Sequence, residues 1–342
     1  MHKEILIIGA GQCGLAAGRL LQIKNKDFLI LEKNREVGET WKKRYDSLKL
    51  FTPAAYSALP GLPLALDPKT RPTKNQIADY FTRYAEHFDL PVSVNEGVLS
   101  ITKENGLFKV KTTLNNISAE KVILANGFCA SPQVPDWAEN LSIPYLHSSA
   151  YRNPLSVKGN KVLVVGAGNS AAQIAAELTK YYEVHWSTWN KPRFSPLHLF
   201  GKNVLWYAEK LGKLEKPVSE KKIKKGEAIF LYDDLKKSLK KTHKRKKVVE
   251  AKGDLVTFED GKSEPYKVVL FATGFKPDFS FIRIDDFEYD LDALRAQQGI
   301  SKVVGLYMLG IPYQRTRSSH LIYGSQRDAA YIVEKLSQTV TA

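Results

Sequence analysis

Between residues 4 and 14 the chain reads Glu4-Ile5-Leu6-Ile7-Ile8-Gly9-Ala10-Gly11-Gln12-Cys13-Gly14. This is a short apolar run, rich in β-branched residues, that enters a glycine turn, and apolar residues at helical spacing follow from Leu15 to Leu21. A second apolar run at 28–31 ends at Glu32. A strand, a glycine turn, a helix, a second strand and a terminal acid within about 30 residues predict a dinucleotide-binding β-α-β unit.

Each glycine of this turn has its own part in binding a nucleotide. Gly9 permits the tight turn, Gly11 lets the main chain lie against a pyrophosphate, and Gly14 lets the helix pack close to the strand. The N-terminus of the helix offers N–H donors and a partial positive charge to the phosphates. Glu32 is placed to bond the hydroxyls of a ribose that lacks a 2′-phosphate. The alternative is a glycine-rich turn without a ligand, which the agreement of all these features disfavours.

The same pattern returns about 155 residues later, so the chain contains a coarse internal repeat. An apolar run at 161–165 enters a glycine turn at 166–171, and a helical pattern leads to a strand at 184–187. No acid ends that strand; Lys191 and Arg193 follow it instead and could pair with a 2′-phosphate. This favours NADPH slightly, with the use of both NADPH and NADH as the alternative.

Two further apolar strands, at 122–124 and 268–271, bracket the second unit, and each ends in a turn with glycine. The sequence therefore predicts an α/β protein with two nested Rossmann-like domains, the arrangement of glutathione-reductase-like flavoproteins. We expect an FAD-binding domain at 1–152 and 271–342 and an NAD(P)H-binding domain at 153–270. The first domain closes with a strand at 306–309 and a helix from about Ser319.

Composition excludes several other classes of protein. The chain has 342 residues, a hydrophobic content of 43% and a net charge of +15. Residues 202–247 hold 16 Lys and Arg against 6 Asp and Glu, so most of the positive charge is concentrated in one basic excursion. The two cysteines give no disulfide framework, and no run of apolar residues is long enough for a membrane span. We expect a cytoplasmic protein.

Five motifs beyond the first glycine turn occur in the order found in one family. They are the second glycine turn and the segments 37–61, 272–278, 305–310 and 317–329. Together they resemble the flavin-containing monooxygenases, and segment 46–61 is most similar to the small bacterial branch of that family. The resemblance extends over nearly the whole chain.

The resemblance implies an enzyme in which NAD(P)H reduces FAD and molecular oxygen adds to the flavin. The resulting peroxyflavin then oxygenates a small sulfide, amine or ketone. It also implies that the last helix directs its N-terminus at the flavin O2 edge, where a helix dipole stabilises the reduced anion. A small-molecule substrate and oxygen are therefore the expected partners.

The sequence departs from the family pattern at two places. His147 and Tyr151 match the family fingerprint, but Leu141 and Ile143 stand where Phe and Gly are expected. Phe51 occupies the closest counterpart of an Asn that supports the peroxide intermediate in many relatives. An NAD(P)H oxidase or diaphorase that releases hydrogen peroxide is therefore the alternative function.

These arguments give a set of candidate site residues. For FAD they are Gly9, Gly11, Gln12, Cys13, Gly14, Glu32, Lys33, Gly38, Thr40, Trp41, Leu48, Phe51, Val98, Ala125, Gly127, Gly310, Gln314 and Leu321, with Phe51 also the candidate catalytic position. For NAD(P)H they are Gly166, Gly168, Asn169, Ser170, Ala171, Ser187, Trp189, Lys191, Arg193, Thr273 and Gly274.

Other classes of function are weaker. A nucleic-acid-binding or membrane-surface protein could use the basic excursion, but aromatic residues are sparsely interleaved there, which favours a solvated face. No spacing typical of a metal site occurs, so no metal is expected. A homodimer is left open.

Overall fold

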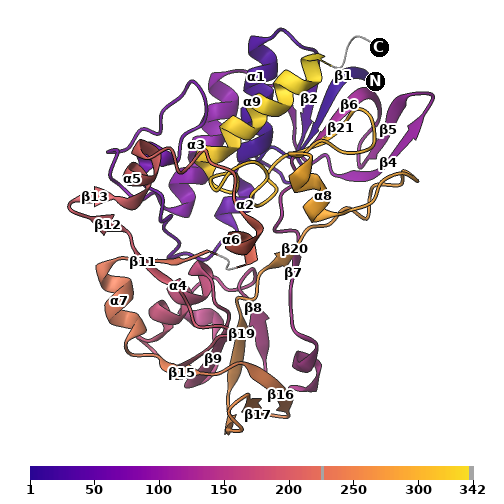
Figure 1. The fold of residues 1–342 in the computed structure, drawn as a ribbon. Coiled ribbons are helices and arrows are strands. Elements are labelled where there is room, and N and C mark those ends of the chain that lie inside the picture. Colours follow the sequence, from indigo (N-terminus) through magenta and orange to yellow (C-terminus); the bar gives the residue numbers. More distant parts are fainter. Residues whose placement is uncertain (225–226, 339–342) are drawn as a thin grey trace.

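The computed structural model describes residues 1–224 and 227–338, and two sheets organise it (Figure 1). The first sheet has the strand order β3-β2-β1-β6-β5-β4, with β21 beside β6. Its strands are β1 His2–Ile8, β2 Phe28–Leu31, β3 Val92–Ser93, β4 Val98–Glu104, β5 Leu107–Thr112, β6 Asn116–Leu124 and β21 Leu306–Met308. β1 pairs in parallel with β2 and β6, whereas β4, β5 and β6 form an antiparallel meander.

Helices cover the apolar faces of this sheet. They are α1 Gln12–Ile23, α2 Glu39–Lys42, α3 Lys74–His87, α8 Leu291–Ala296 and α9 Ile322–Gln338, with a 3-10 turn η1 at Ala54–Tyr56. α1 and α9 lie side by side at the top of Figure 1, so the first and last helices of the chain share one core. α3 begins with a capping box in which Thr73 and Gln76 bond each other's backbone N–H groups.

The second sheet is entirely parallel, with the order β15-β10-β9-β19-β8. Its strands are β8 Tyr145–His147, β9 Lys161–Val165, β10 Glu183–Ser187, β15 His243–Arg245 and β19 Val268–Phe271. One face packs on the helices α4 Asn169–Leu178 and α7 Asp233–Leu239. The other face packs on a meander, β16 Val248–Lys252, β17 Leu255–Phe258 and β18 Ser263–Pro265, and on the 3-10 helix η2 Asp136–Asn140.

The chain crosses between the sheets along two neighbouring segments. β7 (Ser131–Pro132) leaves the first sheet, and β20 (Phe275–Lys276) returns and pairs with it antiparallel. The predicted nesting of two Rossmann-like units is therefore confirmed. The predicted domain boundaries stay predictions; β8 precedes the boundary at 153 and already lies in the second sheet, because it pairs with β19.

The basic excursion folds against the rest of the protein. Besides α7 and β15, it contains β13 Lys202–Asn203, α5 Val204–Lys210, α6 Glu220–Lys224 and β14 Ile229–Leu231, while β11 Phe194–Pro196 and β12 His198–Leu199 precede it. Leu205 and Leu214 are buried with Tyr56 of the first domain. The predicted excursion includes residues 225–226, which lie outside the described residues. No helix within the described ranges is both long and apolar enough to cross a bilayer.

The last helix begins at Ile322, slightly later than the sequence predicts. The hydroxyl of Ser319 accepts hydrogen bonds from the backbone N–H groups of Arg315 and Thr316 at 3.1 and 3.0 Å. These bonds hold residues 315–319 in a compact loop, so the helical pattern starts only after it.

Candidate functional site

The first glycine turn is fixed by close contacts and leaves one position open. A Cβ atom on Gly9, whose φ is +106°, would lie 2.6 Å from the Ala125 carbonyl oxygen, and one on Gly14 would lie 1.9 Å from the Gly9 carbonyl oxygen. A Cβ atom on Gly11 meets no heavy atom within 4 Å. Packing therefore requires glycine at 9 and 14, whereas the space beside Gly11 can receive a phosphate at the start of α1. Gln12 opens that helix.

Glu32 lies at the carboxyl end of β2 with its carboxylate turned toward the glycine turn. Its Oε2 accepts a hydrogen bond from the Ala10 backbone N–H at 2.9 Å. Glu32 is buried, whereas Lys33 beside it is exposed. Val98 opens β4 two residues after Glu96, whose N–H donates to the Glu32 carbonyl at 2.9 Å. The acid is therefore held where a ribose attached to the turn-bound phosphate would meet it.

Trp41 packs on a neighbouring helix. Gly38 has a φ of +86°, and a Cβ there would lie 2.4 Å from the Ala78 carbonyl oxygen of α3, so α2 approaches α3 closely. The Trp41 ring meets Phe81 of α3 edge-on, with centroids 6.4 Å apart, while Thr40 is exposed. A flavin contact of Trp41 stays a prediction.

Leu48 and Phe51 face the second domain. Leu48 packs against the core cluster that contains Tyr45 and Tyr151. The Phe51 ring stacks on Phe230, which belongs to β14, with centroids 4.7 Å apart and an interplanar angle of 23°. The candidate catalytic position therefore lies where the two nucleotide-binding units meet.

A small cavity of about 110 Å³ opens beside these two rings. Its lining residues are Phe51, Ser195, Val204, Leu205, Ala208, Leu214, Glu227, Phe230, Arg317, His320 and Leu321. Phe51 and Leu321, predicted as FAD contacts from opposite ends of the chain, thus share one cavity. Burial lowers the pKa of His320, and its Nδ1 has no hydrogen-bond partner among the described residues. The cavity combines an apolar wall with the His320 imidazole, the Arg317 cation and the Glu227 carboxylate, which lies 3.8 Å from His320 Nε2.

The C-terminal strand meets the first turn through Gly310. A Cβ at Gly310 would lie 3.1 Å from the Cys13 sulfur. Burial raises the pKa of Cys13 to about 12, so the thiol is not a nucleophile at neutral pH. The side chain of Gln314 is engaged within the protein, since its Nε2 donates to the Met308 carbonyl at 2.9 Å. Gly127 follows β6 with a φ of +80°.

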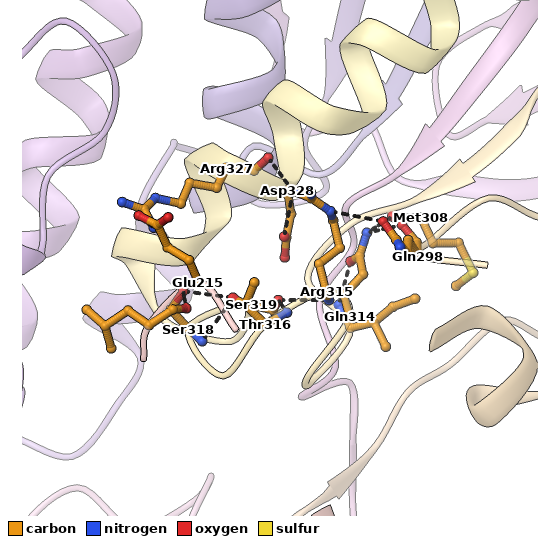
Figure 2. A network of polar contacts seen from close by, with 12 residues as sticks. Glu215, Gln298, Met308, Gln314, Arg315, Thr316, Ser318, Ser319, Arg327 and Asp328 are labelled. Atoms are coloured by element: carbon orange, nitrogen blue, oxygen red, sulfur yellow. Dashed lines mark hydrogen bonds and ion pairs between the residues drawn. The ribbon is translucent and has the colours of Figure 1, made fainter. Parts of the chain in front are cut away.

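Asp328 is a candidate site residue that the sequence arguments did not select, although segment 317–329 contains it. It hangs from α9 toward the loop that carries Arg315 and Ser319, as Figure 2 shows. It is 1% exposed, and neither carboxylate oxygen has a hydrogen-bond partner among the described residues. Burial raises its pKa to about 6, opposed by Ser319 and by Arg315, whose Nη1 lies 3.9 Å away.

A buried carboxyl that has no hydrogen-bond partner, and an ion pair only at 3.9 Å, costs free energy. Such a group is typical of a site that binds a polar ligand. Asp328 lies close enough to Cys13 to raise the pKa of that thiol, which places the carboxyl near the first glycine turn. The open space at Gly11, the oriented Glu32 and the unsatisfied Asp328 together fit a dinucleotide with a polar chain, as FAD has.

The second glycine turn repeats the geometry of the first. A Cβ on Gly166, whose φ is +149°, would lie 2.3 Å from the Ala272 carbonyl oxygen, whereas a Cβ on Gly168 meets nothing within 4 Å. Ala171, which replaces the third glycine, is fully buried, and a Cβ at Gly166 would approach its own to 3.2 Å. The position beside Gly168 is therefore open to a second phosphate at the start of α4.

Asn169 connects this turn to the aromatic pair. Its Oδ1 accepts a hydrogen bond from the Phe230 backbone N–H at 3.1 Å, and the neighbouring Ser170 is exposed. A hydrogen bond therefore connects the candidate NAD(P)H turn to Phe230, whose ring stacks on Phe51.

A larger cavity of about 850 Å³ lies at the carboxyl edge of the second sheet. Its lining residues are Pro132, Gln133, Val134, Pro135, Asp136, Trp137, Val165, Ser187, Trp189, Lys247, Val248, Val249, Thr273 and Lys276. Val165, Ser187 and Thr273 end or follow three neighbouring strands, which is where open parallel sheets bind nucleotides. The predicted residues Ser187, Trp189 and Thr273 are brought together here.

The cations of this cavity differ from those that the sequence suggested. Lys191 and Arg193 are exposed and are not among its described lining residues, whereas Lys247 and Lys276 are. Lys247 follows β15, which pairs with β10, and so stands beside the end of the predicted strand although it lies about 60 residues away. Spacing from the glycine turn could not have indicated it.

We expect Lys247→Ala to raise the KM for NADPH about 10- to 150-fold, because a charge-assisted hydrogen bond contributes about 1.5–3 kcal/mol. The KM for NADH, which lacks the 2′-phosphate, stays unchanged. Lys191→Ala is the matched control and leaves both values unchanged. Steady-state kinetics with each cofactor measure this; a reversed pattern would assign the phosphate to the Lys191 loop.

His147, a residue of the family fingerprint, anchors the turn at Gly274. His147 Nε2 lies 3.0 Å from the Gly274 carbonyl oxygen, and the ring meets Phe275 edge-on. The Thr273 hydroxyl donates to the Gln133 carbonyl. His147 therefore fixes the crossing between the two sheets and is a positioning residue.

Residues of the basic excursion are used within the fold. Glu209 of α5 accepts hydrogen bonds from the hydroxyls of Tyr56 and Tyr323 at 2.7 and 2.8 Å. Lys244 lies over the Trp186 ring at 3.6 Å, and burial lowers its pKa to about 8. The Glu209 bonds fasten α5 over the smaller cavity, and the Lys244 contact joins β15 to β10. Both favour a structural use of the segment over nucleic-acid binding.

Residues 6–310 match the family model described as pyridine nucleotide-disulphide oxidoreductase. The chain belongs to this family. It is 40% identical over 341 residues to an uncharacterized CzcO-like oxidoreductase of Geobacillus kaustophilus, over 97% of this chain and 98% of the relative. It is also 34% identical over 190 residues to YUCCA7 of Arabidopsis thaliana, a probable indole-3-pyruvate monooxygenase, over 52% of this chain and 44% of the relative.

Solved structures are similar along the whole chain. A flavin-containing monooxygenase from Stenotrophomonas maltophilia has a TM-score of 0.85 at 22% identity, over 99% of each chain. OTEMO in complex with FAD and NADP has a TM-score of 0.72 at 16% identity, over 98% of this chain and 84% of its own. The predicted flavoprotein fold and the relationship to flavin-containing monooxygenases are confirmed. The chain is an oxidoreductase, and the cofactors in the OTEMO complex are the pair predicted for it.

Proposed function

We propose that this chain is an FAD-dependent, NAD(P)H-consuming monooxygenase that acts on a small organic substrate. The observation that carries the proposal is the pair of glycine turns, each with an open position, at Gly11 and at Gly168, beside a helix N-terminus. Two such sites suit a flavin dinucleotide and a pyridine nucleotide that exchange electrons. Bound FAD would supply the redox chemistry and the activation of oxygen.

The protein's own residues bind and orient the two cofactors. Gly11 and the N-terminus of α1 would take the FAD pyrophosphate, Glu32 the adenosine ribose, and Asp328 a hydroxyl or N–H group farther along the molecule. At the second site, Gly168 would take the pyridine nucleotide pyrophosphate, with Lys247 close to the ribose. The larger cavity supports a preference for NADPH, since two lysines line it against one acid, Asp136.

In the proposed reaction, NAD(P)H, a proton, dioxygen and the substrate give NAD(P)⁺, water and the oxygenated substrate. The apolar wall of the smaller cavity supports a small sulfide, amine or ketone as substrate. Arg317 offers a cation to a carboxylate. The Arabidopsis relative is named for indole-3-pyruvate, an aromatic 2-oxo acid with a carboxylate. Compounds of this class are therefore also worth testing as substrates.

A second candidate function is an NAD(P)H oxidase, in which NAD(P)H, a proton and dioxygen give NAD(P)⁺ and hydrogen peroxide. One observation favours it: the Phe51 ring is stacked on Phe230. The position that in relatives supplies an amide therefore offers no hydrogen bond here. Oxygen consumption measured together with hydrogen peroxide release, with and without substrates of the classes above, distinguishes the two functions.

When no substrate is present, we expect the unmodified enzyme to release hydrogen peroxide at an appreciable rate, because no other product can take up the electrons. Phe51→Asn lowers that release about 2- to 10-fold, since a neutral hydrogen bond contributes about 0.5–1.5 kcal/mol. Phe51→Leu is the control, because it shortens the side chain without adding a donor. The rate of hydrogen peroxide release without substrate is the measurement; equal effects of Asn and Leu on that rate would show that only the shape of the side chain matters.

A further inference from the structure

Three side chains of the kinds that bind metals lie close together near the amino ends of β10 and β15 in the second sheet. β10 and β15 pair in parallel, and their register sets His185 directly beside His243. Their side chains therefore project from the same face, with ring centroids 4.9 Å apart. Glu183 lies two residues before His185 and shares that face. One nitrogen or oxygen atom of each residue lies within 4.8 Å of those of the other two.

The arrangement suits a cation with free coordination positions. His185 is 2% exposed, and its Nε2 lies 2.8 Å from Glu183 Oε1, so both atoms point to one place. Glu183 and His243 are exposed, so solvent can reach that place and complete a coordination shell. Two imidazoles and a carboxylate are typical ligands of zinc and of neighbouring divalent transition metals.

An outer shell fixes the buried imidazole. His185 Nδ1 lies 2.7 Å from the Tyr266 hydroxyl and 3.3 Å from Glu264 Oε2. Glu264 is in turn held by Lys161 at 2.9 Å and by Arg245 at 2.6 Å. Metal-binding histidines characteristically bond a carboxylate or another acceptor through the second ring nitrogen. Arg245 is thus paired with a carboxylate that is not itself needed as a ligand. Lys161 makes its shorter ion pair with the same carboxylate, and its Nζ also lies 3.8 Å from Oε1 of the proposed ligand Glu183.

We propose that Glu183, His185 and His243 bind one divalent transition-metal ion, with Zn²⁺ as the preferred occupant. The ion would join the edge strand β15, which closes the basic excursion, to the centre of the second sheet. The alternative is a hydrogen-bonded ion-pair network that needs no metal. The site lies at the amino ends of β10 and β15, opposite the nucleotide edge, so the proposal is independent of the proposed function.

The test uses the full chain without an affinity tag, purified with its cofactor and stripped of metal by a chelator. Zn²⁺ is titrated in competition with a chromophoric chelator, and we expect one equivalent to bind. His243→Ala weakens binding at least about tenfold, the range in which even outer-shell changes act. His198→Ala is the matched control, because it removes an exposed histidine from β12, and it binds as the unmodified chain does.

A second variant and a second readout protect the test against misfolding. Glu183→Gln keeps the size of an exposed side chain while replacing a charged ligand by a neutral one, and it also weakens Zn²⁺ binding. Zn²⁺ raises the Tm of the unmodified protein and of His198→Ala, and raises it less in His243→Ala. The proposal is overturned if the unmodified chain binds no Zn²⁺ in the competition, or if His243→Ala and His198→Ala bind it equally.

Discussion

Gly11→Val yields a folded protein that is purified without flavin. Gly11 has a φ of −81° and ψ of −172°, an extended conformation that valine adopts readily, and a Cβ there meets no protein atom. The free energy of unfolding of the apoprotein falls by only about 1 kcal/mol, because valine is a poorer N-cap than glycine. The added methyl groups occupy the space of the pyrophosphate, so FAD binding is abolished.

The measurement is the flavin content of the purified variant, with circular dichroism to check the fold. FAD released from the unmodified protein by heat is identified by chromatography, and recovery of FMN would contradict the assignment of the site. A fully flavin-loaded Gly11→Val protein would show that the phosphates lie elsewhere. Gly14→Val is unsuitable as a control, since a Cβ at 14 would collide with the Gly9 carbonyl oxygen.

Gly168→Val retains its flavin but loses reduction by NADPH. Gly168 caps α4 with a φ of −100° and ψ of 179°, and a Cβ there also meets no protein atom. Valine therefore fits the backbone and occupies only the space of the second pyrophosphate. Dithionite, which needs no binding site, still bleaches the flavin of this variant.

The two glycine variants control each other. Each alters the same structural position in one of two repeated units, so a general effect of valine on folding would act on both. Rapid-mixing measurements of flavin reduction compare Gly168→Val with the unmodified enzyme. Normal reduction by NADPH in Gly168→Val would place the pyridine nucleotide outside the second turn and would remove the basis for the roles of Ser187 and Lys247.

The local part of the fold was predictable from the sequence. The strand expected at 28–31 is β2, and the run at 161–165 is β9. Strand, turn and helix of a β-α-β unit lie within a few tens of residues, so apolar periodicity and glycine spacing are sufficient to indicate them. Glu32 likewise points at its own turn, as its position at the end of the strand predicts.

Features that depend on strand order were not predictable in this way. β8 joins the second sheet only through pairing with β19, more than 120 residues later. Lys247 reaches the larger cavity, and His243 reaches His185, because β15 pairs with β10. No spacing along the chain encodes that register, which tertiary packing decides.

Burial and contacts between distant segments were also not predictable from the sequence. Asp328 lies in a sequence that predicts a helix, α9, which packs on α1. The residues beside it in the sequence do not indicate that its carboxyl is buried without hydrogen bonds. Phe51 was selected through the family resemblance, but its stacking on Phe230 depends on how the second unit is placed against the first. Asp328 becomes a candidate site residue, and the surroundings of Phe51 become known, only when burial and contacts are known.

Anaerobic titration of the purified protein with NADPH tests the central claim most directly. The account predicts a yellow protein whose flavin absorbance is bleached by one equivalent of NADPH and restored by oxygen, with NADPH oxidised in equal amount. A colourless protein that gains no flavin absorbance on incubation with FAD, or a flavin that NADPH leaves oxidised, would contradict it.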